Sequence, residues 1–343
     1  MSFASLKSLR IIGISVMALV VLGGVGYLTL IPRPMEPPLT VGSVEELESY
    51  LNKLAGHNPD SPPGLSLVVV TDGGIAYQNG FGFADRPRNI PATAETVYNQ
   101  WSMVKPITAV AVLQLHEQGL LDIDNPVSDY LPFFKVEYPS ENSETITVRH
   151  LLNHSSGLGN NVPEVIGWIH FDGDPEWNQT ELITDRFSAY AELEYEPGSR
   201  AVYTNVGYMV IAAVVEAVSG KTFQQYMIDH IFEPLGMEQT NWTYTEAMIG
   251  HEAAGSTPRL DIMTLLLPLV LEKDKRGALI REKEQGMIWF NRIYTDQKGP
   301  TGPVGPATDT ARFLIAYLND GNLDRQRILS AESIAMLTDE SHI

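Results

Sequence analysis

The chain contains no cysteine, so neither its chemistry nor its stability can depend on sulfur. Disulfide cross-links, thiol nucleophiles and zinc sites built from cysteine are all excluded. Basic residues are also scarce, with 23 lysines and arginines against 42 aspartates and glutamates, and the formal charge is −19. A surface of this sign repels nucleic acid and anionic lipid headgroups at long range, so we expect no nucleic-acid partner.

Metal-binding patterns are missing as well. His116-Glu117 begins the zinc-protease pattern, but Leu120 occupies the position of its second histidine. His150 and His154 share a helical i, i+4 spacing that could hold a metal, although no third ligand lies at a useful spacing. We therefore expect structural roles for these histidines, and no metal or organic cofactor.

One uncharged run, residues 11–31, is long enough to cross a bilayer. Positive charges precede it at Lys7 and Arg10, which places residues 1–10 in the cytoplasm and the rest of the chain outside. A cleaved signal peptide is the alternative, but it would normally have a shorter apolar region and an A-x-A-like site. The pattern favours an uncleaved, single-pass transmembrane anchor.

After this run the chain reads as a spacer and one domain. Residues 32–42 are rich in proline and predict a stiff extended spacer before a domain over residues 43–343. Ser43 and Glu46 form a capping box that predicts the start of a helix. Two β-type runs at 65–70 and 75–83, separated by an Asp-Gly-Gly turn, predict a β-hairpin.

Apolar residues then recur at helical spacing from Ser102 to Gly119. Pro106 must lie in the opening turn of this helix, where proline is tolerated. Ser102 is thus expected at a helix N-terminus, where the dipole and free N–H groups favour developing negative charge.

The rest of the domain is predicted to be mainly helical. Helices are expected at 148–152, 208–218 and 308–318. The apolar run at 260–271 is too short to span a bilayer, and we favour a buried helix over a segment lying on the membrane. Residues 273–284 carry mixed charges and predict a solvated face.

Ser102 and Lys105 form the pair with the clearest chemical meaning. Serine is a weak nucleophile until a base takes its proton. A lysine three residues away lies on the same helix face, and burial can lower its pKa enough for it to act as that base. The pair predicts acyl transfer through a serine ester, but an S-x-x-K is expected about once by chance in a chain of this length.

The order of three segments gives the pair its context: Ser102-Met103-Val104-Lys105, then His154-Ser155-Ser156-Gly157, then Tyr203-Thr204-Asn205. In this order they resemble the β-lactamase-related serine hydrolases, a family that includes class C β-lactamases, D,D-carboxypeptidases and esterases. The resemblance extends from about residue 63 to about residue 336 and is weakest at 259–297.

The resemblance implies Ser102 as nucleophile, Lys105 as its proton acceptor and Tyr203 as proton shuttle to the leaving group. Asn205 would orient the lysine and bind the substrate amide. The implied fold is α/β (α+β): an antiparallel sheet flanked by helices, a mostly helical second lobe, and the serine in the cleft between them. The implied substrate is a small molecule or peptide with an ester, amide or β-lactam bond.

Tyr-x-Asn occurs at more than one place in the chain, and context selects among its occurrences. Tyr50 and Tyr317 lie on predicted helices, whereas Tyr203 follows a Glu-Pro-Gly turn in a loop. No G-x-S-x-G is present, so the nucleophile elbow of α/β-hydrolases is excluded.

The family's third motif, Lys-Thr-Gly or His-x-Gly on an edge strand, is not matched. No His-x-Gly occurs, and the only Lys-x-Gly, at Lys275-Arg276-Gly277, lies in a charged segment without strand alternation. We therefore expect that the C-terminal part of the domain is missing and that this chain alone has weak or no activity. The competing prediction is a non-catalytic, membrane-tethered domain of the same fold.

Overall fold

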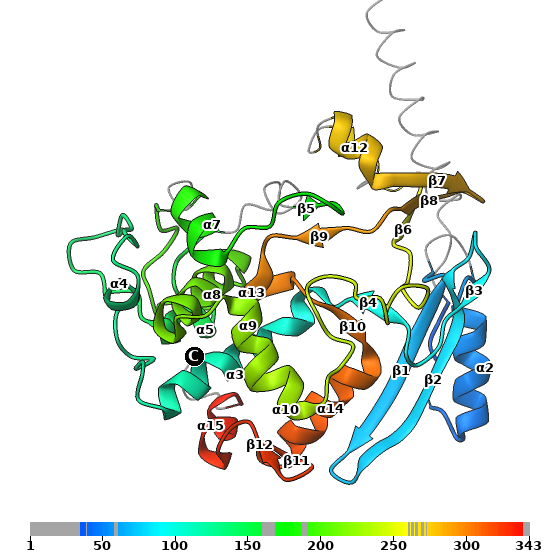
Figure 1. Ribbon diagram of the computed structural model, residues 1–343, viewed down its shortest axis with the longest axis horizontal. Helices are drawn as coiled ribbons and strands as arrows, with labels where there is room; N and C mark the ends of the chain where they lie inside the picture. Colours follow the sequence, from blue (N-terminus) through cyan, green and yellow to red (C-terminus); the bar gives the residue numbers. More distant parts are fainter. Residues whose placement is uncertain are drawn as a thin grey trace, which may run out of the picture. The chain divides into compact units, whose positions relative to one another are not determined.

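The computed structural model describes residues 35–38, 40–57, 61–159, 169–186, 191–259, 261, 264, 267–268, 271 and 273–338 (Figure 1). The chain divides into two compact units, Met1–Pro63 and Gly64–Ile343. The predicted transmembrane run, residues 11–31, lies outside the described residues.

In the first unit, α2 (Val44–Leu54) begins where the capping box predicts. The Ser43 hydroxyl accepts a hydrogen bond from Glu46 N at 3.3 Å. The Glu46 carboxylate accepts from Gly42 N at 2.8 Å, one residue earlier than in the usual reciprocal box.

The second unit opens with the predicted hairpin. Strands β1 (Gly64–Thr71) and β2 (Gly74–Asp85) pair antiparallel, and β3 (Ile90–Pro91) pairs with β2 to complete a three-stranded sheet (Figure 1). Gly74 has φ = 122° in the turn, a conformation that glycine adopts without strain.

Smaller sheets join segments that are distant in sequence. Among the described residues they are β4 (Val97–Asn99) with β10 (Val304–Pro306), β5 (Ile169–His170) with β9 (Tyr294–Thr295), β6 (Ser256–Pro258) and β7 (Ile280–Glu284) on either side of β8 (Met287–Phe290), and β11 (Asn322–Leu323) with β12 (Gln326–Arg327).

Helix α8 (Asn205–Ser219) is the centre of the helical lobe. Its residues are apolar on nearly every side, and those from 206 to 216 are all buried, as expected for a core helix. Figure 1 shows α3 (Lys105–Glu117), α7 (Gln179–Arg186) and α13 (Lys298–Thr301) around it, and α5 (Val148–Leu152) also contacts it.

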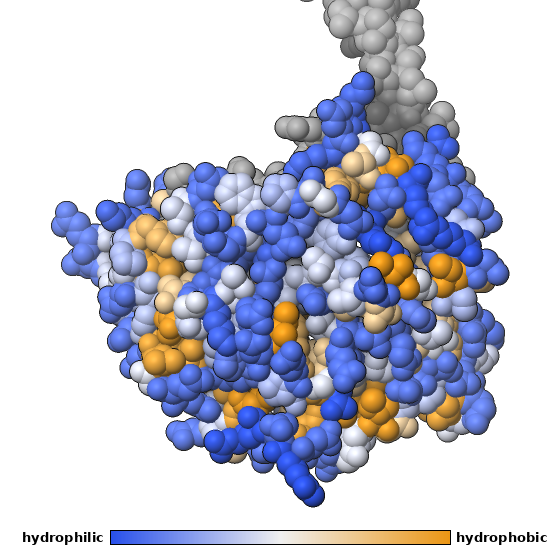
Figure 2. Space-filling view, viewed as in Figure 1, coloured by the Kyte–Doolittle hydropathy of each residue, from blue (hydrophilic) through white to orange (hydrophobic). Residues whose placement is uncertain are grey.

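The remaining described helices are shorter or peripheral. They are η1 (Trp101–Val104), α4 (Val127–Tyr130), α9 (Phe223–Met227), η3 (Ile228–Phe232), α10 (Glu233–Leu235), α12 (Lys273–Leu279), α14 (Ala307–Leu318) and α15 (Ala331–Met336). The face of the protein in Figure 2 is mainly hydrophilic with separate hydrophobic patches, in keeping with an apolar core and a highly charged surface.

Three sequence expectations need correction. The helix after Ser102 begins as a 3₁₀ turn, η1, and becomes α-helical only at Lys105. The helix expected at 208–218 starts earlier, at Asn205, because the Thr204 side chain accepts from Val206 N and caps it. Residues 273–284 form α12 and the paired strand β7 rather than only a solvated face.

The apolar run at 260–271 is described only in part. Leu267 and Leu271 are buried in a small cluster with Ile169 and Leu279. For these two residues the expectation of burial is confirmed.

Within the described part of the chain, no single helix combines the length and apolarity needed to cross a membrane. The helices Asn205–Ser219 and Phe223–Leu235 pass such a test together, with a bend of 78° between them.

We predict that Ile211→Ala in α8 lowers the free energy of unfolding by about 2–5 kcal/mol, because the side chain is fully buried and its removal leaves a cavity. Urea denaturation followed by circular dichroism measures the change. The matched control is Ile249→Ala, where the side chain is 51% exposed and the expected change is within about 0.5 kcal/mol. Equal losses in the two variants would contradict the central position of α8.

Candidate active site

Ser102 lies where a strand passes into a helix. Strand β4 is held by pairing with β10, and η1 follows at once with Met103 N donating to Gln100 O at 3.1 Å. Pro106 lies in the first turn of α3, as predicted. The nucleophile candidate is therefore fixed on regular elements rather than on a mobile loop.

The structure brings together all four residues that the resemblance singled out. Ser102 Oγ lies 2.7 Å from Tyr203 Oη, and either hydroxyl can donate. Lys105 Nζ donates to Ser102 Oγ at 3.1 Å and to Asn205 Oδ1 at 2.8 Å. Tyr203 Oη also donates to Asn205 Oδ1, at 3.4 Å. Tyr203 and Asn205 flank the cap of α8, so the start of that helix positions both.

Lys105 is the buried member of this cluster, with 5% of its surface exposed. Burial disfavours the charged amine and lowers the pKa of Lys105 to about 8. About a tenth of the lysine is then neutral at pH 7, compared with less than a thousandth for an ordinary lysine. Such an amine can accept the proton of Ser102.

A third acceptor for Lys105 comes from a part of the chain without a recognisable motif. The carbonyl of Pro300 in α13 accepts from Lys105 Nζ at 3.0 Å. The next carbonyl back, Gly299 O, accepts from Thr108 Oγ1 at 2.8 Å, which fastens α13 to α3. A Cβ at Gly299 would lie 2.3 Å from Tyr208 O, so only glycine fits there.

His154 also lies at this site, although its i, i+4 spacing from His150 had suggested only a possible metal ligand. Its ring lies 4.7 Å from that of Tyr203, and its Nδ1 accepts from Thr204 N at 3.3 Å. Burial, together with the charge of Lys105, lowers the pKa of His154 to about 4, so it is neutral at pH 7. His154 thus supports Tyr203 by packing against its ring. The only sequence signal for this role was the position of His154 in the second of the three ordered segments.

Neither metal ligation nor the Lys-x-Gly segment finds support in the geometry. His150 Nδ1 accepts from Thr147 N at 3.3 Å in the cap of α5, so this histidine has a structural role. The described residues contain no group of three or more possible ligands that could hold a metal. Lys275 and Gly277 lie in helix α12 rather than on an edge strand.

A cavity of about 670 Å³ opens beside the cluster. Its lining includes Ser102, Lys105 and Tyr203, together with apolar side chains of α14 and α15 such as Phe313 and Met336. This size is typical of a small-molecule site. The cluster is therefore accessible to a substrate of moderate size.

Comparison with known proteins agrees with this geometry. The family model described as Beta-lactamase matches residues 51–343. Protein flp of Staphylococcus aureus is 31% identical over 203 residues, which cover 57% of this chain and 39% of that relative. Penicillin-binding protein 4* of Bacillus subtilis is 31% identical over 216 residues, covering 60% of this chain and 45% of that protein. The chain therefore spans less than half the length of these curated relatives.

A solved structure supports the same assignment. The octameric penicillin-binding protein homologue from Pyrococcus abyssi matches with a TM-score of 0.62 and 26% sequence identity, over 85% of this chain and 59% of that one. Because the family model spans most of the chain, and the matched segment contains the cluster around Ser102, this protein belongs to the β-lactamase family of serine hydrolases.

Proposed function

We propose that this protein cleaves an ester or amide bond through an acyl group carried on Ser102. One observation carries the proposal: Ser102 Oγ lies within hydrogen-bond distance of both a buried lysine amine and a tyrosine hydroxyl. A nucleophile needs a base to take its proton, and the leaving group needs an acid to supply one. The two neighbours of Ser102 provide these two functions.

The reaction then proceeds in two steps. Ser102 Oγ bonds to the carbonyl carbon while its proton passes to neutral Lys105. The bond to the leaving oxygen or nitrogen breaks as Tyr203 donates a proton to it, and the proton held by Lys105 restores the tyrosine. Water next attacks the acyl carbon and gives a proton to the same pair. The bond between that carbon and Ser102 Oγ breaks, the pair returns the proton to Oγ, and the acid is released. Asn205 keeps Lys105 in place throughout by accepting from its amine.

The apolar lining of the adjoining cavity favours an uncharged group next to the scissile bond. A β-lactam, a peptide amide and a simple ester all satisfy this requirement. The alternative is a domain that keeps the fold and binds a ligand without turnover. Covalent labelling separates the two proposals, since only a competent nucleophile becomes acylated.

We predict that a fluorophosphonate or penicillin probe modifies Ser102, because the lysine and tyrosine activate that hydroxyl. Intact-protein mass spectrometry with peptide mapping locates the adduct. Ser102→Ala should abolish it, while Ser140→Ala, a change at an exposed turn, should leave it unchanged. An adduct that persists in Ser102→Ala would exclude the assignment, and a chain that is folded but never labelled would favour the non-catalytic alternative.

The rate of labelling should depend on the neutral form of Lys105. With a pKa of about 8, it should rise about tenfold per pH unit from pH 5 to 7 and level off above pH 8. Lys105→Ala should slow labelling by about 100-fold or more and remove this pH dependence. Lys53→Ala serves as the control for a lost positive charge outside the site. A profile that is flat across pH 8 in the unmodified chain would rule out Lys105 as the base.

We also propose that residues 11–31 anchor the protein in a membrane with the domain outside. Support comes from the uncharged run and from Lys7 and Arg10 before it. The full-length chain should sediment with membranes and be cut by protease added to intact cells, whereas a chain lacking residues 1–32 should not sediment. Full-length protein in the soluble fraction would contradict the anchor.

A further inference from the structure

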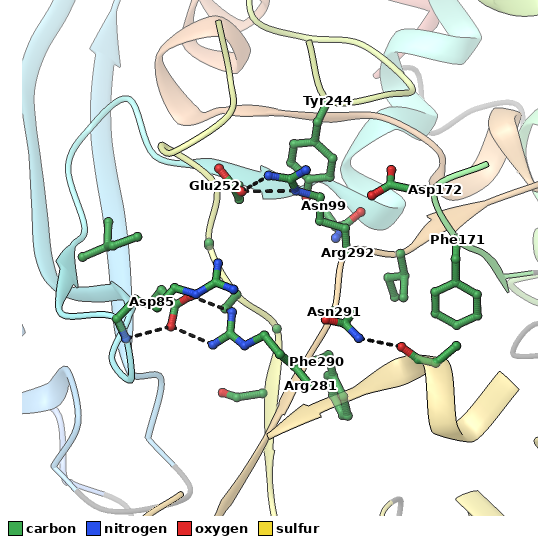
Figure 3. A pocket seen from close by; sticks show the side chains of 18 of the residues that line it. Asp85, Asn99, Phe171, Asp172, Tyr244, Glu252, Arg281, Phe290, Asn291 and Arg292 are labelled. Carbon is green, nitrogen blue, oxygen red and sulfur yellow. Dashed lines mark hydrogen bonds and ion pairs between the residues drawn. The ribbon is translucent and has the colours of Figure 1, made fainter. Parts of the chain in front are cut away.

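A second cavity, of about 790 Å³, has Trp101 in its lining, and Figure 3 shows side chains around it. Trp101 directly precedes Ser102, so their Cα atoms are about 3.8 Å apart. It has φ = 47°, a strained conformation for a bulky residue, and 44% of its surface remains exposed. Trp101 thus connects the backbone of the nucleophile to the wall of this cavity.

At one end of the cavity, one of two arginines is only weakly paired. Asp85 is buried and accepts two hydrogen bonds from Arg281, at 2.7 and 2.8 Å. Arg88 lies farther from the same carboxylate, with Nε at 3.7 Å, and its side chain is 59% exposed. The other partner of Arg281, Glu282, is not part of the lining. Arg281 is thus neutralised by Asp85 and Glu282, whereas Arg88 makes only the longer contact and keeps guanidinium donors for a ligand.

At the other end, carboxylates outnumber arginines. Glu252 is held by Arg292, which also lies over the Tyr244 ring at 5.4 Å. Asp172 is exposed and accepts a hydrogen bond from the neutral Tyr294 hydroxyl at 2.5 Å. Two carboxylates therefore face a single guanidinium group. Figure 3 shows Asp85 and Asp172 on opposite sides of the cavity, so the weakly paired Arg88 beside Asp85 lies apart from the Asp172 carboxylate.

The lining also contains apolar side chains, among them Trp101, Phe171, Phe290 and Ile293. They offer a surface on which the apolar body of a ligand can pack. A ligand with a single charge would satisfy one end and leave the other unmatched. A ligand with a carboxylate and an ammonium group at opposite ends of an apolar body would satisfy both.

We propose that this cavity binds a small zwitterion, a free amino acid or a short peptide with unblocked termini. Its carboxylate pairs with Arg88, as guanidinium groups readily do with carboxylates, and its ammonium pairs with Asp172. The body packs on Trp101, which places the ligand next to Ser102. Only the identification of this zwitterion as substrate or product depends on the proposed hydrolase function; the binding does not.

The test uses the full chain carrying Ser102→Ala, so that no ligand is consumed, and titration calorimetry with three probes. They are alanyl-phenylalanine, its N-acetyl form, which lacks the ammonium, and its C-terminal amide, which lacks the carboxylate. The free dipeptide should bind about tenfold or more tightly than either blocked form, since each blocked form loses one charge-assisted hydrogen bond.

Two variants test which residue binds each charged group of the ligand. Arg88→Gln should abolish the preference for the free carboxylate and keep the preference for the free ammonium, and Asp172→Asn should do the reverse. Arg86→Gln and Glu181→Gln change charge outside the lining and should alter neither preference. Equal affinity for the three probes, no binding of any of them, or equal weakening of all three in both variants would overturn the proposal.

The outcome is separable from that of the proposed function. Dipeptide binding with this pattern, in a protein whose Ser102 is never labelled, would keep the zwitterion site and reject the hydrolase. If Ser102 is labelled but the three dipeptide probes bind equally, the hydrolase is kept and the zwitterion site is rejected.

Discussion

The burial of the Lys105 amine is the constraint on which the site depends. A buried charge without partners costs several kcal/mol, so a lysine that is 5% exposed must either lose its proton or find acceptors. Here both occur in part: its pKa falls to about 8, and three oxygens, from Ser102, Asn205 and Pro300, lie within 3.1 Å. With this pKa the amine is mostly protonated at pH 7, but it loses its proton far more readily than an ordinary lysine does.

Three elements must meet for those acceptors to converge. The start of α3 brings Ser102, the capped start of α8 brings Asn205, and α13 brings the Pro300 carbonyl. Helix α8 is buried on nearly all sides and contacts both of the others, so it fixes their spacing. A further contact fixes α13, because Lys298 Nζ in this helix forms an ion pair with Glu176 at 2.8 Å. Removing Glu176 would leave the buried Lys298 amine without this partner and would disturb a carbonyl that orients the base.

The sequence was informative wherever a side chain carried the signal. The hairpin, the place of Pro106, the helix end at Gly119 and the selection of Tyr203 all followed from residue types at a given spacing. It was silent on Pro300, because a backbone carbonyl has no residue signature and its position is set by packing between distant segments. Strand β7 was missed because its charged residues hide the alternation that identifies a strand. Strands β6 and β8, of 3 and 4 residues, are too short to show an alternation.

The few basic residues of the chain are distributed unevenly between the two cavities. In a chain with a formal charge of −19, three arginines line one cavity, and two of them hold carboxylates there. The cavity between α3 and α14 is lined by one arginine, Arg149, which donates two hydrogen bonds to Asp124. Ser102 lines the cavity with one arginine, and Trp101 lines the cavity with three. Under the two proposals above, a scissile bond at Ser102 would lie between a neutral group and a charged one, and an asymmetric substrate would bind in one direction.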